Sequence, residues 1–554
     1  MINQAERNPV RQWLFLVIVF CCAFFVNNKA IFVDIMESRN LITAREMVYD
    51  GNWLTPTMNG ELRLEKPPLP TWIAAAVEWV SPDNIGLQRA VAGMAAVLLA
   101  VFLYLLAVRL TRDRLYAFIA VLLLCTSYSI VLMGRTASWD IYCHAFMIVA
   151  IYYLYKALQA STCRWSWFTI AGVMMGLSFL GKGPVSFYAL LLPFLCAYGL
   201  YYKVNLKDKW KGGLWMLFLT LLISSWWYVY IYVSHPEMME YVLKKESGSW
   251  MNYNVRPWWY YWKFFLETGA WSLLTLTALL VPVWRKRLAD PKPYYFVLVW
   301  MLFVLFFLSL IPEKKSRYLL PVVIPAVLTG AHLFVYWIEQ MKVDDRLGRL
   351  LYRMNAGLIL LVTCALPFLL YRYVYSEMHM GLGAYLFLSL LCIGIGVGVF
   401  YAFRKVRPYT FLLGVVGLMM IAELFMMPYI GSFVTNKERK SISLTRDIKA
   451  LKPLPFYQDS RDTLRIELVY AAYKKILKID LSDTLQVRRS LPFVLVSKEK
   501  AEEVLPEYVL DKVELTPIDR YNDNPWPKGH RRYTEDFINY VTVIREKKDD
   551  EQDE

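Results

Sequence analysis

A chain of 554 residues that is 57% hydrophobic and only 19% charged departs from a soluble domain, in which about a quarter of the residues are charged. The formal net charge of +15 would suit a nucleic-acid partner if the cations formed one binding surface. They concentrate instead in alternate loops between long apolar runs, which is the positive-inside pattern of membrane proteins. Composition and charge therefore exclude a soluble nucleic-acid binder and predict a polytopic α-helical membrane protein.

Apolar runs of about 20 residues, the length that crosses a bilayer, recur along most of the chain. We predict about 13 transmembrane helices, near residues 13–30, 86–108, 115–133, 139–159, 166–181, 184–202, 213–232, 263–284, 294–311, 318–339, 351–371, 382–403 and 409–429. The basic loops place the N-terminus in the cytoplasm, and an odd number of spans places the C-terminal segment on the outer side.

The outer side carries the longer connecting segments. We predict a transmembrane domain over residues 1–433, in which the loop 33–84 forms short helices that lie along the membrane surface. From residue 434 charges become dense and strand-like pieces alternate with helical ones, as in "PFVLVSKEKAEEVL". Residues 434–554 are therefore predicted to form a small extracytoplasmic α/β domain that ends in a disordered acidic tail.

Ionisable residues also fall on the outer side, where the positive-inside rule depletes cations. Charged groups at the edge of the apolar zone are costly unless they are paired or solvated, and they mark functional sites by default. The alternative is that they anchor helix ends and pair with each other. The residues concerned are the acids Asp34, Glu37, Glu65, Asp140 and Glu246 and the cations Arg135, Lys182, Lys314, Lys315 and Arg317.

Carboxylates gathered with lysine and arginine at a membrane surface suit a phosphate-bearing lipid substrate. The cations match a phosphate or diphosphate, and arginine adds bidentate geometry. A carboxylate there can act as a general base or hold a divalent ion. A polyprenyl phosphate is the phosphate-bearing substrate expected in that layer. The sequence has no glycine-rich loop of the kind that binds nucleotide phosphates, so we predict no nucleotide cofactor.

A series of motifs in fixed order carries a resemblance to a known family. The stretches are "ESRNLITAREM", "GNWLTPTMNGELRLEKPPLPTW", "GRTASWD", "FLGKG", "RPWWYY" and "KSRYLLP". In this order they resemble the lipid A aminoarabinose transferases, within the protein O-mannosyltransferase-like glycosyltransferases of the GT-C superfamily. The resemblance covers roughly residues 10–430 and implies a GT-C-like fold in a bacterial inner membrane, with the C-terminal domain in the periplasm.

The resemblance also implies roles for individual residues. It makes Asp140 a catalytic acid and Glu65 a metal-ligand candidate, and it assigns the donor phosphate to Lys66, Lys182, Arg39, Lys315, Arg317 and Tyr318. Two positions depart from the family pattern. The family's leading acid is replaced by Met36, so its role passes to Glu37 or Asp34, and the family's histidine ligand is replaced by Ser247 after Glu246. A divalent metal ion held by Glu65 and Glu246 therefore stays an open expectation.

These residues predict a glycosyltransferase that moves a sugar, with inversion, from a polyprenyl-phosphate donor to an envelope lipid or glycan of the lipid A type. The rival hypotheses are a polymerase or ligase of lipid-linked glycans, a transporter of polyprenyl-linked sugars, and a non-catalytic envelope assembly protein. A transporter would be expected to show inverted repeats and charges at mid-membrane, and neither is visible in this sequence. The sequence names neither the sugar nor the acceptor.

Overall fold

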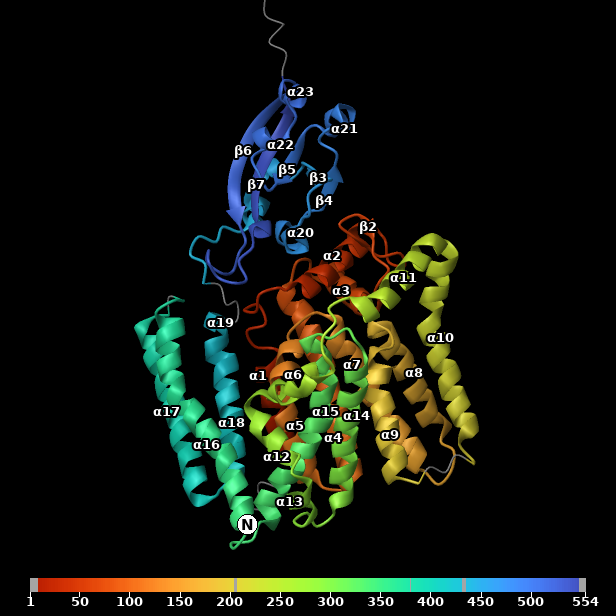
Figure 1. Ribbon diagram of the computed structural model, residues 1–554, viewed down its shortest axis with the longest axis vertical. Coiled ribbons are helices and arrows are strands. Elements are labelled where there is room, and N and C mark those ends of the chain that lie inside the picture. The colour runs from red at the N-terminus through yellow and green to blue at the C-terminus, as the bar shows by residue number, and fades with distance from the viewer. Residues whose placement is uncertain (1–7, 204–206, 379, 431–434, 548–554) are drawn as a thin grey trace, which may run out of the picture. The chain divides into compact units, whose positions relative to one another are not determined.

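The apolar runs of the sequence form helices in the computed structural model, which describes residues 8–203, 207–378, 380–430 and 435–547 (Figure 1). The described residues divide into two compact units. We call the first the helical unit, from the ranges Met1–Ala30, Leu64–Ile73 and Val80–Ile430. We call the second the mixed unit, from Ile31–Arg63, Ala74–Trp79 and Gly431–Glu554. The mixed unit thus joins part of the first loop to the C-terminal segment, and the predicted domain boundary near residue 433 stays a prediction.

Eight helices in the described part of the chain are long and apolar enough to cross a bilayer, and a bent pair could add a ninth. The pair is α5 (Arg114–Cys125) with α6 (Tyr128–Gly134), which are inclined by 67°. The chain is therefore a multi-span membrane protein. The eight are α4 (Ile85–Thr111), α7 (Trp139–Gln159), α10 (Trp210–Ser234), α14 (Pro291–Leu310), α15 (Leu320–Val335) within Ser316–Gln340, α16 (Arg346–Leu369) within Arg346–Tyr375, α17 (Leu382–Lys405) and α18 (Pro408–Ile421) within Pro408–Ile430.

The number of such spans is lower than the predicted count of about 13, because several apolar runs form short or broken helices. The predicted span at 263–284 is divided among the 3-10 helix η3 (Trp258–Trp271), α12 (Ser272–Ala278) and α13 (Val281–Arg285). Gly269 breaks it with a φ of 59°, a left-handed conformation that glycine adopts without strain. The remaining helices of this unit are shorter or less apolar: α1 (Pro9–Phe24), α3 (Leu69–Val80, shared with the mixed unit), α8 (Trp165–Lys182), α9 (Leu192–Tyr201), α11 (Pro236–Asn252) and α19 (Met427–Ile430).

A buried ion pair joins the last span to the start of the helical unit. Arg135 is fully buried, and its Nη2 lies 2.7 Å from Glu423 Oε2 in the π-helical turn η7 (Ala422–Met426). Its Nε donates to the carbonyl of Ala23 at 2.6 Å and its Nη1 to that of Val26. Arg135 was expected among the outer-side functional cations. The structure gives it a structural role instead, because its charge and its hydrogen bonds are taken up by α1 and the last span.

The C-terminal part of the mixed unit is a five-stranded sheet in the order β4-β3-β5-β7-β6. The parallel strands β3 (Phe456–Asp459), β4 (Ile476–Ile479) and β5 (Phe493–Ser497) are followed by β6 (Val513–Asn522) and β7 (Ile538–Glu546), which pair antiparallel. Short helices connect them: α20 (Ile466–Ala472), α21 (Thr484–Ser490), α22 (Ala501–Val504) and α23 (Glu507–Leu510). Separate apolar clusters around Phe456 and Phe493 cover the sheet. The predicted C-terminal α/β domain is confirmed.

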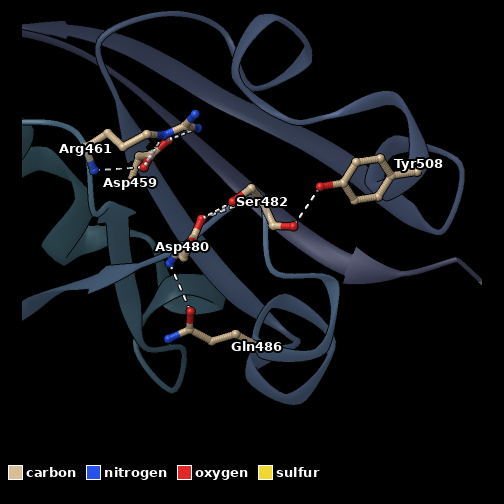
Figure 2. A network of polar contacts seen from close by, with 6 residues as sticks. All are labelled: Asp459, Arg461, Asp480, Ser482, Gln486 and Tyr508. Atoms are coloured by element: carbon tan, nitrogen blue, oxygen red, sulfur yellow. Dashed lines mark hydrogen bonds and ion pairs between the residues drawn. The ribbon is translucent and has the colours of Figure 1, made fainter.

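Polar side chains at the carboxyl ends of β3 and β4 satisfy one another locally (Figure 2). Arg461 donates hydrogen bonds to the carboxylate of Asp459 through Nη2 at 2.6 Å and through Nε at 3.1 Å. The carboxylate of Asp480 accepts the amide of Ser482 at 2.9 Å, and Tyr508 donates to the carbonyl of Ser482 at 2.7 Å. The carboxyl ends of parallel strands are the usual place for a ligand in α/β sheets. Here these side chains instead stabilise the turns that follow each strand.

The first outer loop supplies the rest of the mixed unit. Helix α2 (Ile35–Tyr49) is followed by the hairpin β1 (Thr57–Met58) and β2 (Glu61–Leu62), whose turn residues Asn59 and Gly60 have φ of 55° and 80°. The side-chain amide of Asn59 exchanges two hydrogen bonds with the backbone of Ile476 on the edge strand β4, at 2.7 and 2.8 Å. Asn59 thus extends the sheet edge, and the Asn-Gly pair forms the turn that it typically favours.

Candidate functional site

The last residue of α8 and the first turn of α7 bring a lysine and a carboxylate together. Lys182 Nζ forms an ion pair with Asp140 Oδ1, and both side chains are more than nine-tenths buried. Two glycines explain why the sequence folds this way. A Cβ on Gly181 would lie 3.1 Å from Cys143 Cβ, so only glycine lets α8 approach α7 this closely. Gly183 has a φ of 70°, and this conformation ends α8 directly after the lysine.

A second cation reaches the same carboxylate from another part of the chain. Arg317 lies in the 3-10 turn η4 (Ser316–Leu319) that precedes α15, and it interacts electrostatically with Asp140. Its Nε is buried and has no hydrogen-bond partner in the part of the chain that the structure describes. The neighbouring ring of Tyr318 lies 5.1 Å from Lys182 Nζ. The donor-phosphate candidates Lys182, Arg317 and Tyr318 therefore meet at Asp140, and one N–H of the arginine is left to bind a ligand.

The lysine that precedes this turn is held by an acid which the sequence analysis did not single out. Lys315 Nζ lies 2.5 Å from Glu313 Oε1 and 3.5 Å from the hydroxyl of Tyr318. The segment that contains "RPWWYY" fixes this loop from outside, because the amide of Lys315 donates to the hydroxyl of Tyr261 at 3.2 Å. The amide of Lys314 donates to the carbonyl of Asn254 at 3.3 Å, and burial lowers the pKa of the Lys314 ammonium. The motifs "RPWWYY" and "KSRYLLP" thus form one structure.

Glu65 and Lys66 each pair with a neighbour on α11. Glu65 Oε1 accepts from Lys245 at 3.0 Å, and Lys66 donates to both oxygens of Glu246 at 3.1 and 3.3 Å. The adjacent residues Glu65 and Lys66 therefore form two ion pairs with the adjacent residues Lys245 and Glu246, an acid on each side meeting a lysine on the other. We call these the crossed ion pairs. The hydrogen bond to Glu65 raises the pKa of Lys245.

A tyrosine connects these crossed ion pairs to the Lys182 turn. The side chain of Tyr228 interacts electrostatically with Glu246, and its hydroxyl lies 4.0 Å from the position of a Cβ on Gly183. The crossed pairs and the Lys182–Asp140 pair thus belong to the same end of the helical unit.

The expected metal ligands do not fit a divalent cation. Among the described residues, no group of three or more His, Cys, Asp or Glu side chains is arranged to hold a metal ion. The carboxylates of Glu65 and Glu246 each contact a lysine ammonium, which contributes charge but no ligand atom. A calcium or magnesium ion needs about six oxygen ligands. Glu65 and Glu246 therefore suit two ion pairs with lysines and not a divalent metal site.

The remaining sequence candidates lie on α2, in the mixed unit. Asp34 is the N-cap of this helix, and its Oδ1 accepts the amides of Met36 at 3.0 Å and Glu37 at 2.8 Å. Glu37 is fully buried in the first turn. Arg39 is half-buried, and its Nε has no hydrogen-bond partner within the described ranges. Asp34 thus has a structural role that the sequence motif did not reveal.

An aromatic clamp fixes α2 within the mixed unit. The guanidinium of Arg45 lies 3.6 Å from the ring centroid of Tyr473, which follows α20. The hydroxyl of Tyr473 donates to Glu78 Oε1 at 2.9 Å and lies 3.1 Å from that of Tyr49. The helix that carries Asp34 and Glu37 is therefore held by residues of the C-terminal segment.

Sequence reasoning missed the acids and the lysine that complete the ion pairs. Glu313, Lys245 and Glu423 each pair with a cation or acid that the sequence analysis did select. Glu423 could have been found, because it is an acid inside the otherwise apolar run "GLMMIAELFMM". Glu313 and Lys245 sit in dense charge runs, where the sequence does not show which charges meet.

Comparison with known proteins agrees with this arrangement. The family model described as dolichyl-phosphate-mannose-protein mannosyltransferase matches residues 13–242. The undecaprenyl phosphate-alpha-4-amino-4-deoxy-L-arabinose arabinosyl transferase of Pseudomonas paraeruginosa is 28% identical over 67% of this chain and 68% of its own length. The crystal structure of ArnT from Cupriavidus metallidurans bound to undecaprenyl phosphate superposes with a TM-score of 0.66. The chain has the fold of ArnT.

That superposition covers 96% of this chain and 97% of ArnT at 15% identity. The predicted resemblance to the aminoarabinose transferases and the predicted GT-C-like fold are therefore confirmed. The sequence matches cover less than the structural superposition does, because the chain spans between 55% and 68% of the length of eight curated relatives that it matches.

Proposed function

We propose that the protein is an integral-membrane glycosyltransferase that transfers a sugar from a polyprenyl-phosphate donor to an envelope lipid or glycan of the lipid A type. The observation that carries this proposal is the convergence of Lys182 and Arg317 on Asp140. The Asp140 carboxylate keeps two cations together, and Arg317 still has a buried N–H for a phosphate oxygen. Relatives whose names specify an undecaprenyl-phosphate sugar donor support the same substrate class.

In the proposed reaction, a hydroxyl or phosphate oxygen of the acceptor attacks the anomeric carbon. The bond between that carbon and the donor phosphate oxygen breaks, and its electron pair leaves with the polyprenyl phosphate. Lys182 and Arg317 stabilise the negative charge that grows on this phosphate, in a site where burial makes such stabilisation strong. Lys315 and Tyr318 border the same position, and Lys66 adds a cation nearby. Attack from the face opposite the phosphate gives inversion.

When the acceptor is a hydroxyl, its proton passes to a carboxylate, whereas an ionised phosphate oxygen attacks without a proton transfer. Asp140 holds the phosphate-binding cations, so it is engaged before the reaction begins. The sequence motif leaves this role to Glu37 or Asp34, and Asp34 already accepts two backbone amides as the cap of α2. Such general-base assistance typically contributes about 10²–10⁴-fold.

Charge distribution supports the proposed orientation in a bacterial inner membrane. The loop after α4, the loop before α10, the turn after α13, the start of α16 and the turn after α17 are all basic. Along the alternating helices these positions lie at the end opposite the start of α7 and the end of α8. By the positive-inside rule the basic end faces the cytoplasm together with the N-terminus, so the candidate site and the C-terminal domain face the periplasm.

The test uses purified protein, a polyprenyl-phosphate sugar donor and a lipid A acceptor, and it measures the release of free polyprenyl phosphate during turnover. We expect Lys182→Ala to lower kcat/KM at least tenfold, because it removes a charge-assisted contact to the leaving phosphate. Lys244→Ala, which removes an exposed lysine paired with Glu240 on α11, serves as the matched control. A native rate in Lys182→Ala contradicts the phosphate role, and movement of intact donor without release of polyprenyl phosphate favours the transporter. Transfer only of preassembled glycan chains favours the polymerase or ligase.

A further inference from the structure

One end of the C-terminal domain carries a concentration of basic side chains that the proposed reaction does not use. We call it the basic end and define it as residues 435–440 and 525–534. Hydrogen bonds hold the two segments side by side: the amide of Thr435 donates to the carbonyl of Pro525 at 2.9 Å, and Asn436 Nδ2 donates to the carbonyl of Asn524 at 3.0 Å. The two segments therefore present one surface.

The charge of this surface is strongly one-sided. It contains six cations and one acid, Glu438. The side chains of Lys437, Lys528 and Arg531 are exposed and form no ion pair within the described residues. The cations are Lys437, Arg439, Lys440, Lys528, Arg531 and Arg532.

The opposite end of the same domain has the opposite charge. Residues 499–511, around α22 and α23, contain five acids and one lysine. Strand β6 runs from Val513 beside this acidic end to Asn522 beside the basic end (Figure 1). Its ten residues separate the two ends by about 33 Å. The domain is thus electrically polarised along β6.

Aromatic stacking orders the basic end. The rings of Trp526 and His530 stack with centroids 4.4 Å apart, and the guanidinium of Arg532 lies 5.9 Å from the Trp526 centroid. Tryptophan and tyrosine are enriched at the headgroup level of membranes, where one part of the ring is apolar and the other is wet. Trp526 and Tyr533 therefore give the basic end the composition of a membrane-facing surface.

We infer that the basic end binds the phosphate-bearing headgroups of anionic lipids and so docks the C-terminal domain on the membrane that the helices cross. Only residues 431–434 separate Ile430, at the end of the last candidate span, from Thr435 in the sequence, so the basic end begins within five residues of a segment long and apolar enough to cross the membrane. Clusters of lysine and arginine near a membrane are attracted by anionic lipids within about one Debye length. The acidic end is repelled by the same charge, and the polarity of the domain therefore fixes which end faces the lipid.

The experiment compares hydrogen–deuterium exchange of the full-length protein in two kinds of nanodisc, one of zwitterionic lipid only and one with about a third anionic phospholipid. We expect backbone amides of residues 525–534 to exchange several-fold more slowly in the anionic discs, and this protection to disappear at high salt. Residues 499–511 should exchange equally in both discs. The readout does not depend on sugar transfer, so it stands or falls separately from the proposed function.

Charge reversal provides the matched comparison. The triple variant Lys437→Glu, Lys528→Glu, Arg531→Glu changes only exposed side chains, and it should lose the protection while the sheet amides of β5 and β7 keep native exchange. The control variant Lys500→Glu, Lys512→Glu changes one exposed lysine in the acidic end and one directly after it, and should keep the protection. Equal exchange of residues 525–534 in the two discs would overturn the inference. Protection that persists in the triple variant would also overturn it.

Discussion

Replacement of Gly181 by alanine tests whether the close approach of α8 to α7 builds the Lys182–Asp140 pair. The added Cβ would lie 3.1 Å from Cβ, 3.2 Å from Cα and 3.3 Å from the backbone nitrogen of Cys143. Carbon atoms pack best at about 3.5–4.0 Å. Two of these three atoms belong to the α7 backbone, so no side-chain rotation relieves the contact and the helices must separate by about 0.5 Å. Overpacking of this kind typically costs about 1–3 kcal/mol.

The shift also moves Lys182, the next residue, away from Asp140. A misplacement of about 1 Å can cost about 10²-fold in rate, so we expect roughly a tenfold lower kcat together with a lower midpoint of thermal unfolding. Gly199→Ala on α9 is the matched control, because nothing lies within 4 Å of its added Cβ. That variant should be neutral or slightly stabilising. A Gly181→Ala protein with native stability and a native transfer rate would refute the reasoning.

Three further predictions concern other parts of the chain. Arg135→Met leaves the Glu423 carboxylate buried without its partner and should destabilise the protein by about 3–5 kcal/mol in thermal unfolding. Adding Glu423→Met should restore much of this stability. A larger loss of stability in the double variant would contradict the reasoning. Arg287 donates two hydrogen bonds to Asp345, at 2.8 and 2.9 Å, and holds the pKa of that carboxyl below its usual range. The pair therefore stabilises the fold above about pH 4 and loses its effect as the pH falls through the lowered pKa. Asp345→Asn should lower the midpoint of thermal unfolding by more at pH 7 than at pH 3. The control Asp344→Asn should leave the midpoint unchanged at both pH values. Finally, a chelator should leave the transfer rate unchanged, since the described carboxylates do not form a metal site; loss of activity that added Mg²⁺ or Mn²⁺ restores would show that they do.

Much of the architecture could be predicted because the lipid bilayer restricts which secondary structure can cross it. Apolar runs must form helices in a bilayer, where every backbone polar group needs an internal partner. The α/β domain could be predicted because, after the last apolar run, charges become dense and strand-like pieces alternate with helical ones. What hydropathy could not predict is where a helix breaks. The break at Gly269 and the bend between α5 and α6 depend on local backbone conformation, which leaves the mean hydropathy almost unchanged.

The candidate site was predictable in part. The positive-inside rule selected Lys182 and Arg317 because both lie on the side that cations avoid, and the structure brings both to Asp140. The same rule selected Arg135, which is buried against α1 and the last span, since the rule detects an unusual charge and not its partner. Pairing is a long-range property. The crossed contacts between Glu65–Lys66 and Lys245–Glu246 join residues 180 positions apart, and only the fold shows them.

The central claim is that Lys182 and Arg317 bind a lipid-borne phosphate at Asp140. The most direct test is the dissociation constant of a polyprenyl phosphate for the native protein, Lys182→Ala and Arg317→Ala, measured without an acceptor. Each substitution removes a hydrogen bond to a charged group worth about 1.5–3 kcal/mol, so each should weaken binding by about tenfold or more. If both variants bind the lipid phosphate as tightly as the native protein does, the phosphate lies elsewhere and the account is wrong.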